Sequence, residues 1–204
     1  MAEMIGYWFA SEPRLPHGDN RAVLIGETLR IGPPIKLCRQ GLHASEHPFD
    51  ALEYAGGALL YQVRLSGKIL RDDDKACATE RTALAMIDAR ALLRTFARQQ
   101  ALSVIHLWKA PEIVLKYLET GDDTLRADAR EAARHARFAA WATARDSAWA
   151  AARDVPWDAA WAAAWAARWT SSSPIERSAK WAAARQTFGD MVVKEFAKQE
   201  QDDV

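Results

Sequence analysis

The stretch from Leu37 to Gly67, LCRQGLHASEHPFDALEYAGGALLYQVRLSG, decides the fold that we expect for the first part of the chain. From Ala58 to Gly67, apolar and polar side chains alternate as they do in a strand with one face in a core. Residues 41–45 also have strand character. Between these strands, Pro48 at an early position and two glycines at 56–57 predict a short helix. The stretch therefore predicts two strands of a sheet joined through one helical turn or two.

Beyond this stretch the pattern changes at about Thr79, where apolar residues begin to recur at helical spacing. We expect an α+β protein. A small N-terminal mixed β-sheet domain covers residues 1–78, with further strands at 5–10 and 22–25, and an all-α region rich in alanine and tryptophan covers residues 79–204. The predicted helices of that region lie at about 79–99, 111–120, 122–154, 156–170 and 174–199.

Tryptophans recur every four residues near the end of the chain, at Trp157, Trp161, Trp165 and Trp169. A step of four residues turns about 40° beyond one helical turn, so these side chains form an inclined ridge. Two interpretations stay open. The indoles fill grooves between helices packed through alanine faces, or some of them stay exposed and bind a protein partner or a second copy. Asp158 disfavours a helix lying in a membrane interface, where the polar face is rich in Lys and Arg.

The totals of the sequence narrow the class of protein. Lys and Arg together number 27, as do Asp and Glu, so the net charge is zero and binding to nucleic acid is disfavoured. Two cysteines give no disulfide framework. A basic leader segment and an apolar run of the roughly 20 residues that span a membrane are both missing. We expect a cytoplasmic protein without a membrane partner.

Candidate chemistry centres on a few Cys and His side chains. Cys38, His43, His47 and Cys77 include the usual zinc-ligand types, but their spacing matches no standard zinc pattern, so we expect no metal. A nucleophilic pair of Cys38 and His43 lacks an orienting third group. The chain has no Walker loop and no G-x-G-x-x-G motif. His43 is the residue of most interest, either as a satisfied histidine at a sheet edge or as a donor that faces a ligand.

The order LCRQGLHAS, DALEYA, ALLYQVRLSG and DDDKACATERT resembles an uncharacterised domain of phage and prophage proteins, over residues 4–90. Members share C-x-x-GLHA, a short helix ending in Tyr-Ala, and a V-x-L-x-G strand, and alanine-rich helical tails are common among them. This resemblance brings no activity with it. It implies a non-enzymatic phage-type accessory protein, without a cofactor, that binds another macromolecule. A protein is the expected partner, inhibition of a host defence system is one form of this function, and a homo-oligomer is compatible with it.

The same region has a remoter likeness to the ADP-ribosyltransferase fold, carried by Gly41 to Ser45 and by the Tyr54-Ala55 pair. The likeness implies an alternative function, a nucleotide-binding or ADP-ribosyl-transferring enzyme that uses NAD. Its implied catalytic candidates are His43 and Glu80, and its implied ligand-binding residues are Tyr7, Ser11, His43 and Tyr54. The first strand offers neither the His nor the Arg that this fold uses for NAD. Whether the protein is an enzyme therefore stays open, with a non-enzymatic role favoured.

Overall fold

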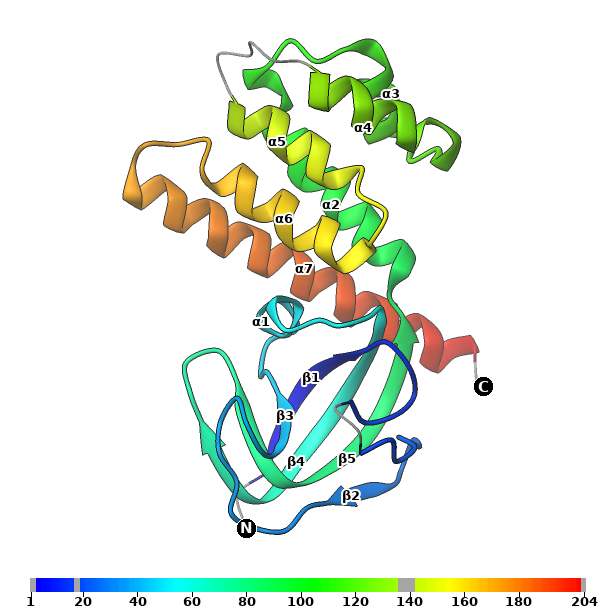
Figure 1. Ribbon diagram of the computed structural model, residues 1–204, viewed down its shortest axis with the longest axis vertical. Coiled ribbons are helices and arrows are strands. Elements are labelled where there is room, and N and C mark those ends of the chain that lie inside the picture. The colour runs from blue at the N-terminus through cyan, green and yellow to red at the C-terminus, as the bar shows by residue number, and fades with distance from the viewer. Residues whose placement is uncertain (1–2, 17–18, 136–141, 203–204) are drawn as a thin grey trace. The chain divides into compact units, whose positions relative to one another are not determined.

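The computed structural model describes residues 3–16, 19–135 and 142–202. The chain divides into two compact units (Figure 1). The first unit comprises Met1–Ala89 and Phe188–Val204, and the second comprises Arg90–Thr187. The α+β class is confirmed, because a sheet occupies the first part of the chain and helices follow it. The division differs from the predicted boundary at residue 78, and the last residues of the chain belong with the sheet.

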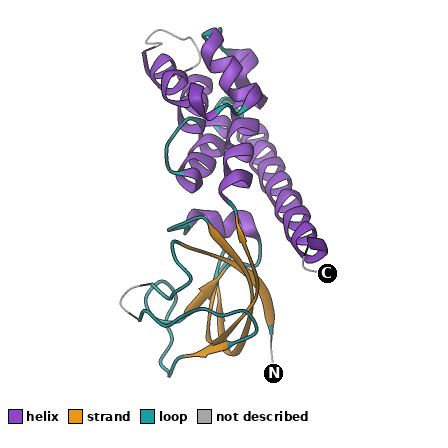
Figure 2. Ribbon diagram, turned by 90° about the vertical axis from the view of Figure 1, so that its right-hand side faces the viewer, coloured by secondary structure: helices purple, strands orange, loops and turns teal. Residues whose placement is uncertain are grey.

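The first unit is built on a five-stranded sheet, drawn in orange in Figure 2. Its ladders between strands are antiparallel, whereas we expected a mixed sheet. The strand order is β1-β4-β5-β2, and β3 also pairs with β5. The strands are β1 (Met4–Ala10), β2 (Thr28–Arg30), β3 (Leu42–Ala44), β4 (Leu59–Arg71) and β5 (Ala76–Asp88). The second predicted strand, at 22–25, forms only isolated bridges, and β2 lies a few residues later.

The long hairpin of β4 and β5 corrects one prediction. The helix predicted over 79–99 is wrong for its first half, because residues up to Asp88 continue β5, and α2 (Arg90–Val104) begins only afterwards. A four-residue turn joins the two strands, with the Asp72 amide donating to the Lys75 carbonyl oxygen at 2.8 Å. Pairing along most of β4 supplies backbone partners that outweigh the helix propensity of the alanines in β5.

The sheet closes on itself through a pair of hydrogen bonds between Tyr7 and Ser45. The Tyr7 amide donates to the Ser45 carbonyl oxygen at 2.7 Å, and the Ser45 amide donates to the Tyr7 carbonyl oxygen at 3.0 Å. This bridge joins the free edge of β1 to the residue after β3, and so completes a ring of strands β1, β4, β5 and β3. Closure of this kind satisfies edge groups that would otherwise be open to another chain.

Apolar side chains from every part of the ring form the core of the first unit. Trp8 and Tyr61 pack on each other there, with ring centroids 5.2 Å apart. The buried members are Met4, Ala10, Leu15, Val23, Leu42, Ala44, Tyr61, Val63, Leu65, Ala76, Ala78 and Ala83. The predicted alternation of β4 holds for Tyr61, Val63 and Leu65, although Leu60, predicted to face away from them, is buried as well.

A short helix, α1 (Pro48–Glu53), and the end of α7 (Pro174–Asp202) pack on one side of the sheet. The rings of Phe49 and Phe188 meet at 6.0 Å with an edge-to-face geometry, and both are fully buried. Pro48 is the first helical residue, as predicted, and His47 caps the helix by accepting the Phe49 amide proton at Nδ1 (3.1 Å). After α1 the chain passes very close to β1: a side chain at Gly57 would lie 2.1 Å from the Ala10 carbonyl oxygen.

The second unit is helical (Figure 1). Its helices after α2 are α3 (Glu112–Thr120), α4 (Arg126–His135), α5 (Ala142–Ala151) and α6 (Pro156–Arg168), followed by the first half of α7. The starts of α3, α6 and α7 fall within one residue of the predictions. The helix predicted over 122–154 is wrong at its ends, because it opens with a 3₁₀ turn at Asp123–Leu125 and α5 stops at Ala151, while 136–141 lie outside the described residues.

Helices α5 and α6 pack through alanines, as the composition indicated. The side chains of Ala144, Ala148, Ala160 and Ala163 are almost fully buried. Ser147, also buried, donates its hydroxyl proton to the Ala163 carbonyl oxygen at 2.9 Å. Small side chains allow backbones to approach this closely. Within the described residues, no helix is both long enough and apolar enough to cross a membrane.

Arginines of α2 and α4 hold the turn between α5 and α6. Arg126 and Arg130 pair with the two carboxylate oxygens of Asp154 at 2.6 and 2.8 Å. The hydrogen bond from Arg126 is the main cause that lowers the pKa of Asp154 below its ordinary value. Arg94 donates to the Asp154 carbonyl oxygen at 2.9 Å. The turn is therefore tied to two helices at once.

Candidate functional site

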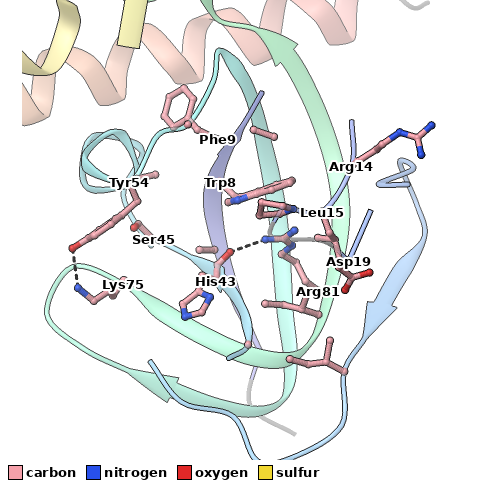
Figure 3. A pocket seen from close by; sticks show the side chains of 18 of the residues that line it. Trp8, Phe9, Arg14, Leu15, Asp19, His43, Ser45, Tyr54, Lys75 and Arg81 are labelled. Carbon is pink, nitrogen blue, oxygen red and sulfur yellow. Dashed lines mark hydrogen bonds between the residues drawn. The ribbon is translucent and has the colours of Figure 1, made fainter. Parts of the chain in front are cut away.

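The first unit contains an open cavity of about 1010 Å³ (Figure 3). Tyr7, Ser11, His43 and Tyr54, the four ligand-binding residues implied by the likeness to ADP-ribosyltransferases, all line this cavity. They come from β1, the residue after it, β3 and the end of α1. The size lies at the upper end of the range of roughly 300–1,000 Å³ that is usual for sites of small molecules. The fold therefore brings together residues that are far apart in the sequence.

Arg81 is the most unusual residue in the wall of this cavity. It lies on β5 opposite Leu65, and the residue is only 3% exposed. Its Nη1 donates to the His43 carbonyl oxygen at 2.8 Å, and its guanidinium carbon lies 3.9 Å from the centre of the Trp8 ring (Figure 3). Its Nη2 is buried without a hydrogen-bond partner in the described part of the chain. A buried cation is costly unless it is paired, so this arrangement needs a physical reason.

No carboxylate among the described residues forms an ion pair with Arg81. Asp19, which also lines the cavity, is held by Arg21 with an Nε to Oδ1 distance of 2.6 Å, and this bond lowers the pKa of Asp19. Burial lowers the pKa of Arg81 to about 9, which leaves the side chain charged at neutral pH. The hydroxyl of Tyr61 is buried nearby and has no hydrogen-bond partner within the described ranges, and burial raises its pKa, so it brings no negative charge to the cation.

His43 uses its side chain within the protein. The Cys38 amide donates to Nε2 of His43 at 3.1 Å, so this nitrogen carries no proton. The imidazole thereby stabilises the turn that precedes β3, in which Cys38 has a positive φ of 61°. Gly41 in this turn has a φ of 151°, and a side chain there would lie 2.8 Å from Cβ of Cys77. The C-x-x-G-L-H-A pattern is thus explained as a turn, a close approach and a side chain that ties the turn.

Glu80, the second catalytic candidate, is not brought to the cavity. Its carboxylate accepts from Arg30 at 3.2 Å and from the Ser66 hydroxyl at 3.0 Å, and it is absent from the residues that line the cavity. The structure therefore does not place His43 and Glu80 together in one pocket. The physical reason is that β5 pairs with β2 at Glu80 and with β3 at Cys77, so the two candidates belong to different ladders.

The four candidate metal ligands do not assemble. Among the described residues, no group of three His, Cys, Asp or Glu side chains is placed to hold a metal ion. Cys38 is exposed, Cys77 is buried, and both are free thiols. His47 caps α1.

The rim of the cavity carries a hydrogen-bonded group of Tyr54, Asp74 and Lys75. The Tyr54 hydroxyl donates to Asp74, and Lys75 donates to the same hydroxyl at 2.8 Å and lies 4.6 Å from the centre of its ring. Burial, followed by the bond to Asp74, raises the pKa of Tyr54, while the bond to Tyr54 raises the pKa of Lys75. With its pKa raised, the Tyr54 phenol stays protonated at neutral pH and acts here as a hydrogen-bond donor and acceptor.

In the second unit the tryptophans form a cluster of Trp161, Trp165, Trp169 and Trp181, here called the indole cluster. Trp161 and Trp165 stack with centroids 6.5 Å apart, and Trp181 of α7 meets both edge-on at 5.1 and 5.8 Å. Trp165 and Trp169 are 45% and 41% exposed, whereas most of the alanines of α6 are buried. Trp157, the first residue of the predicted ridge, is half-buried.

Arginines cover part of the indole cluster. The guanidinium carbon of Arg168 lies 5.0 Å from the centre of the Trp181 ring and 5.5 Å from that of Trp165. Arg177 lies 4.6 Å from the centre of the Trp169 ring. The helices pack through alanine, and large parts of Trp165 and Trp169 are exposed to solvent. Binding of a partner by these indoles stays a prediction.

Comparison with known proteins identifies one domain. Residues 24–95 match a family described as a domain of unknown function (DUF7666). The match covers β2 to the start of α2, including His43 and Arg81, and leaves out β1 with Tyr7 and Trp8. No curated protein and no solved structure matches the chain. This part of the chain thus corresponds to an uncharacterised domain family.

Proposed function

We propose that this protein is a binding protein, not a catalyst, and that the indole cluster is its contact with a protein partner. The observation that carries the proposal is the exposure of Trp165 and Trp169, at 45% and 41%. Tryptophan and arginine are the residues most enriched at the energetic centres of interfaces. Here both kinds occur side by side on one unit, with the Arg168 guanidinium 5.5 Å from the centre of the Trp165 ring and 5.0 Å from that of Trp181.

Because the rings are already packed on each other, the cluster is preorganised, and little rotamer freedom remains to be lost on binding. The resemblance to phage and prophage proteins supports a phage-type accessory role in the cytoplasm, with a component of a host defence system as one kind of partner. A second copy of the chain is another.

A pull-down from a bacterial lysate tests this proposal. The Trp161→Ala/Trp165→Ala variant should lose the partner, since each hot-spot indole contributes about 2 kcal/mol or more to binding. The control is Leu24→Ala/Ile25→Ala, which removes two side chains of the first unit that are 52% and 54% exposed. A partner retained by the tryptophan variant, with its helical content intact, would refute the proposal. Molar mass in solution shows whether the partner is a second copy.

A second function is supported by a different observation, the convergence of Tyr7, Ser11, His43 and Tyr54 on one cavity. We propose as the alternative that the cavity binds a small ligand such as a nucleotide. The form of this proposal that includes ADP-ribosyl transfer needs a glutamate beside the ligand, and Glu80 lies outside the cavity lining. Calorimetric titration with NAD and ADP-ribose tests it, with His43→Ala as the variant. Absence of heat at millimolar ligand would refute nucleotide binding.

A further inference from the structure

We propose that the cavity of the first unit binds its ligand through an oxyanion, a carboxylate or a phosphate, and that Arg81 is the residue that recognises it. This inference rests on the second proposal above, that the cavity holds a ligand, and does not depend on the indole cluster. It is carried by a side chain that the sequence did not single out.

The first step is the unbalanced charge. Arg81 is 3% exposed, and its contacts in the described chain are a carbonyl oxygen and the face of an indole. Both are attractive to a cation, yet neither carries a negative charge. Buried arginines are normally paired with a carboxylate, because an unpaired charge in a medium of low polarity is costly. A ligand oxyanion would supply the missing partner.

The second step is that two nearby acids, Asp19 and Glu80, already have partners of their own. Asp19 forms two hydrogen bonds to Arg21, at 2.6 and 2.8 Å. Glu80 is bound to Arg30 and Ser66.

The third step is the character of the cavity wall. Arg14 and Arg39, from two separate segments, line the cavity together with Arg81, and so does Lys75, which is paired with Asp74 at 3.4 Å; Glu12 and Asp19 are the acids that line it. The excess of positive charge favours an anion and raises its local concentration. Leu15, Ile31 and Leu42 supply apolar wall, so the ligand has an apolar part beside its acid group.

The fourth step is the geometry of the donor. The Nη2 group has no partner among the described residues and exposes less than 1 Å². Planar guanidinium groups match the two oxygens of a carboxylate or phosphate. Leu15 and Trp8 lie beside the guanidinium group (Figure 3). The proposal requires that side chains here change rotamer to admit the ligand, as side chains around a site commonly do on binding.

The experiment is calorimetric titration of the full chain with inorganic phosphate, AMP and succinate at constant ionic strength. The wild type should bind at least one of these probes, and the arms with phosphate and with carboxylate identify the acid group. Arg81→Met should weaken that binding on the order of 100-fold, since it removes the buried charge that the anion pairs with. The matched control is Arg64→Met on the neighbouring strand, where the arginine is 44% exposed and does not line the cavity.

Guanidinium NMR resonances keep the proposal testable if Arg81→Met does not fold. In the wild-type chain the Nε–H signal of Arg81 should shift on titration, and the signal of Arg64 should not. The proposal is overturned if none of the three probes binds the wild type at millimolar concentration, or if Arg81→Met binds as tightly as the wild type. Binding of succinate without AMP would refute the nucleotide proposal and support this one. If a probe binds the wild type and Arg81→Met but not His43→Ala, the proposal about Arg81 is refuted and the nucleotide proposal is supported.

Discussion

Replacing Arg81 by methionine should stabilise the ligand-free protein, although the residue is buried. Methionine has a similar length and fills the space without a charge. Burial lowers the pKa of Arg81 to about 9. This shift is caused by the loss of hydration, and because each pKa unit corresponds to about 1.36 kcal/mol, that loss alone costs on the order of 5 kcal/mol before the two contacts described next are counted.

Two contacts offset this cost in the wild type. The hydrogen bond to the His43 carbonyl oxygen contributes about 2 kcal/mol. The contact with the Trp8 ring contributes about 2 kcal/mol when desolvated. The net gain on replacing Arg81 by methionine is therefore about 1 kcal/mol, at the low end of the gain of about 1–4 kcal/mol seen when buried ionic groups are replaced by apolar ones.

Urea denaturation at neutral pH without added phosphate measures this gain. The midpoint should rise for Arg81→Met with an unchanged slope, and the melting temperature should rise by about 2–4 °C. Arg64→Met should stay within about 0.5 kcal/mol of the wild type, as surface substitutions do. If Arg81→Met instead lowers the free energy of unfolding by more than 1 kcal/mol, the guanidinium is a structural tie, and the reasoning from unbalanced charge fails.

Three further predictions concern stability. Gly57→Ala should cost several kcal/mol, because its Cβ would lie 2.1 Å from a backbone oxygen, whereas the neighbouring Gly56→Ala, with nothing within 4 Å, should be near neutral in the same urea assay. Ala163→Leu should lower the free energy of unfolding by about 1–3 kcal/mol, because it overpacks the contact between α5 and α6. The control Ala182→Leu, on an exposed face, should not lower it. Asp154→Asn should lower the urea midpoint more at pH 7 than at pH 2.5. Folding lowers the pKa of this carboxyl below 3.8, so ionised Asp154 stabilises the protein above that pH, and this stabilisation is lost as the pH falls through the lowered pKa. An equal loss at both pH values would contradict this account.

The sequence was informative where one local pattern determined the structure. Alternation specified most of the buried face of β4, and Pro156 and Pro174 marked the starts of α6 and α7. It failed at β5, because Ala83 and Ala85 carry the propensity of a helix while their backbone partners come from β4. A strand whose pairing is supplied by tertiary structure cannot be distinguished from a helix by composition.

The candidate site could be predicted only in part, for a similar reason. Tyr7, Ser11, His43 and Tyr54 were named through a likeness between families, and the cavity does bring them together. Arg81 was missed because its neighbours in the sequence, Glu80 and Thr82, suggest a solvated segment. Its burial depends on closure of the ring by Tyr7 and Ser45 and on the position of Trp8, and no local pattern reports either of these.

Helix α7 has a consequence for the order in which the protein is completed. Its last half belongs to the same unit as β1, and Phe196 contacts Tyr7 with ring centroids 6.4 Å apart. During synthesis the segments that pack against Phe188 and Phe196 leave the ribosome first. Their packing partners on α7 are made only after the whole helical unit. Contacts between such distant parts of a chain form late and slowly, and the apolar surface they cover stays open meanwhile. The unit that is begun first is therefore the one that is finished last, and a nascent chain that ends before Phe188 presents an uncovered sheet to chaperones and to other chains.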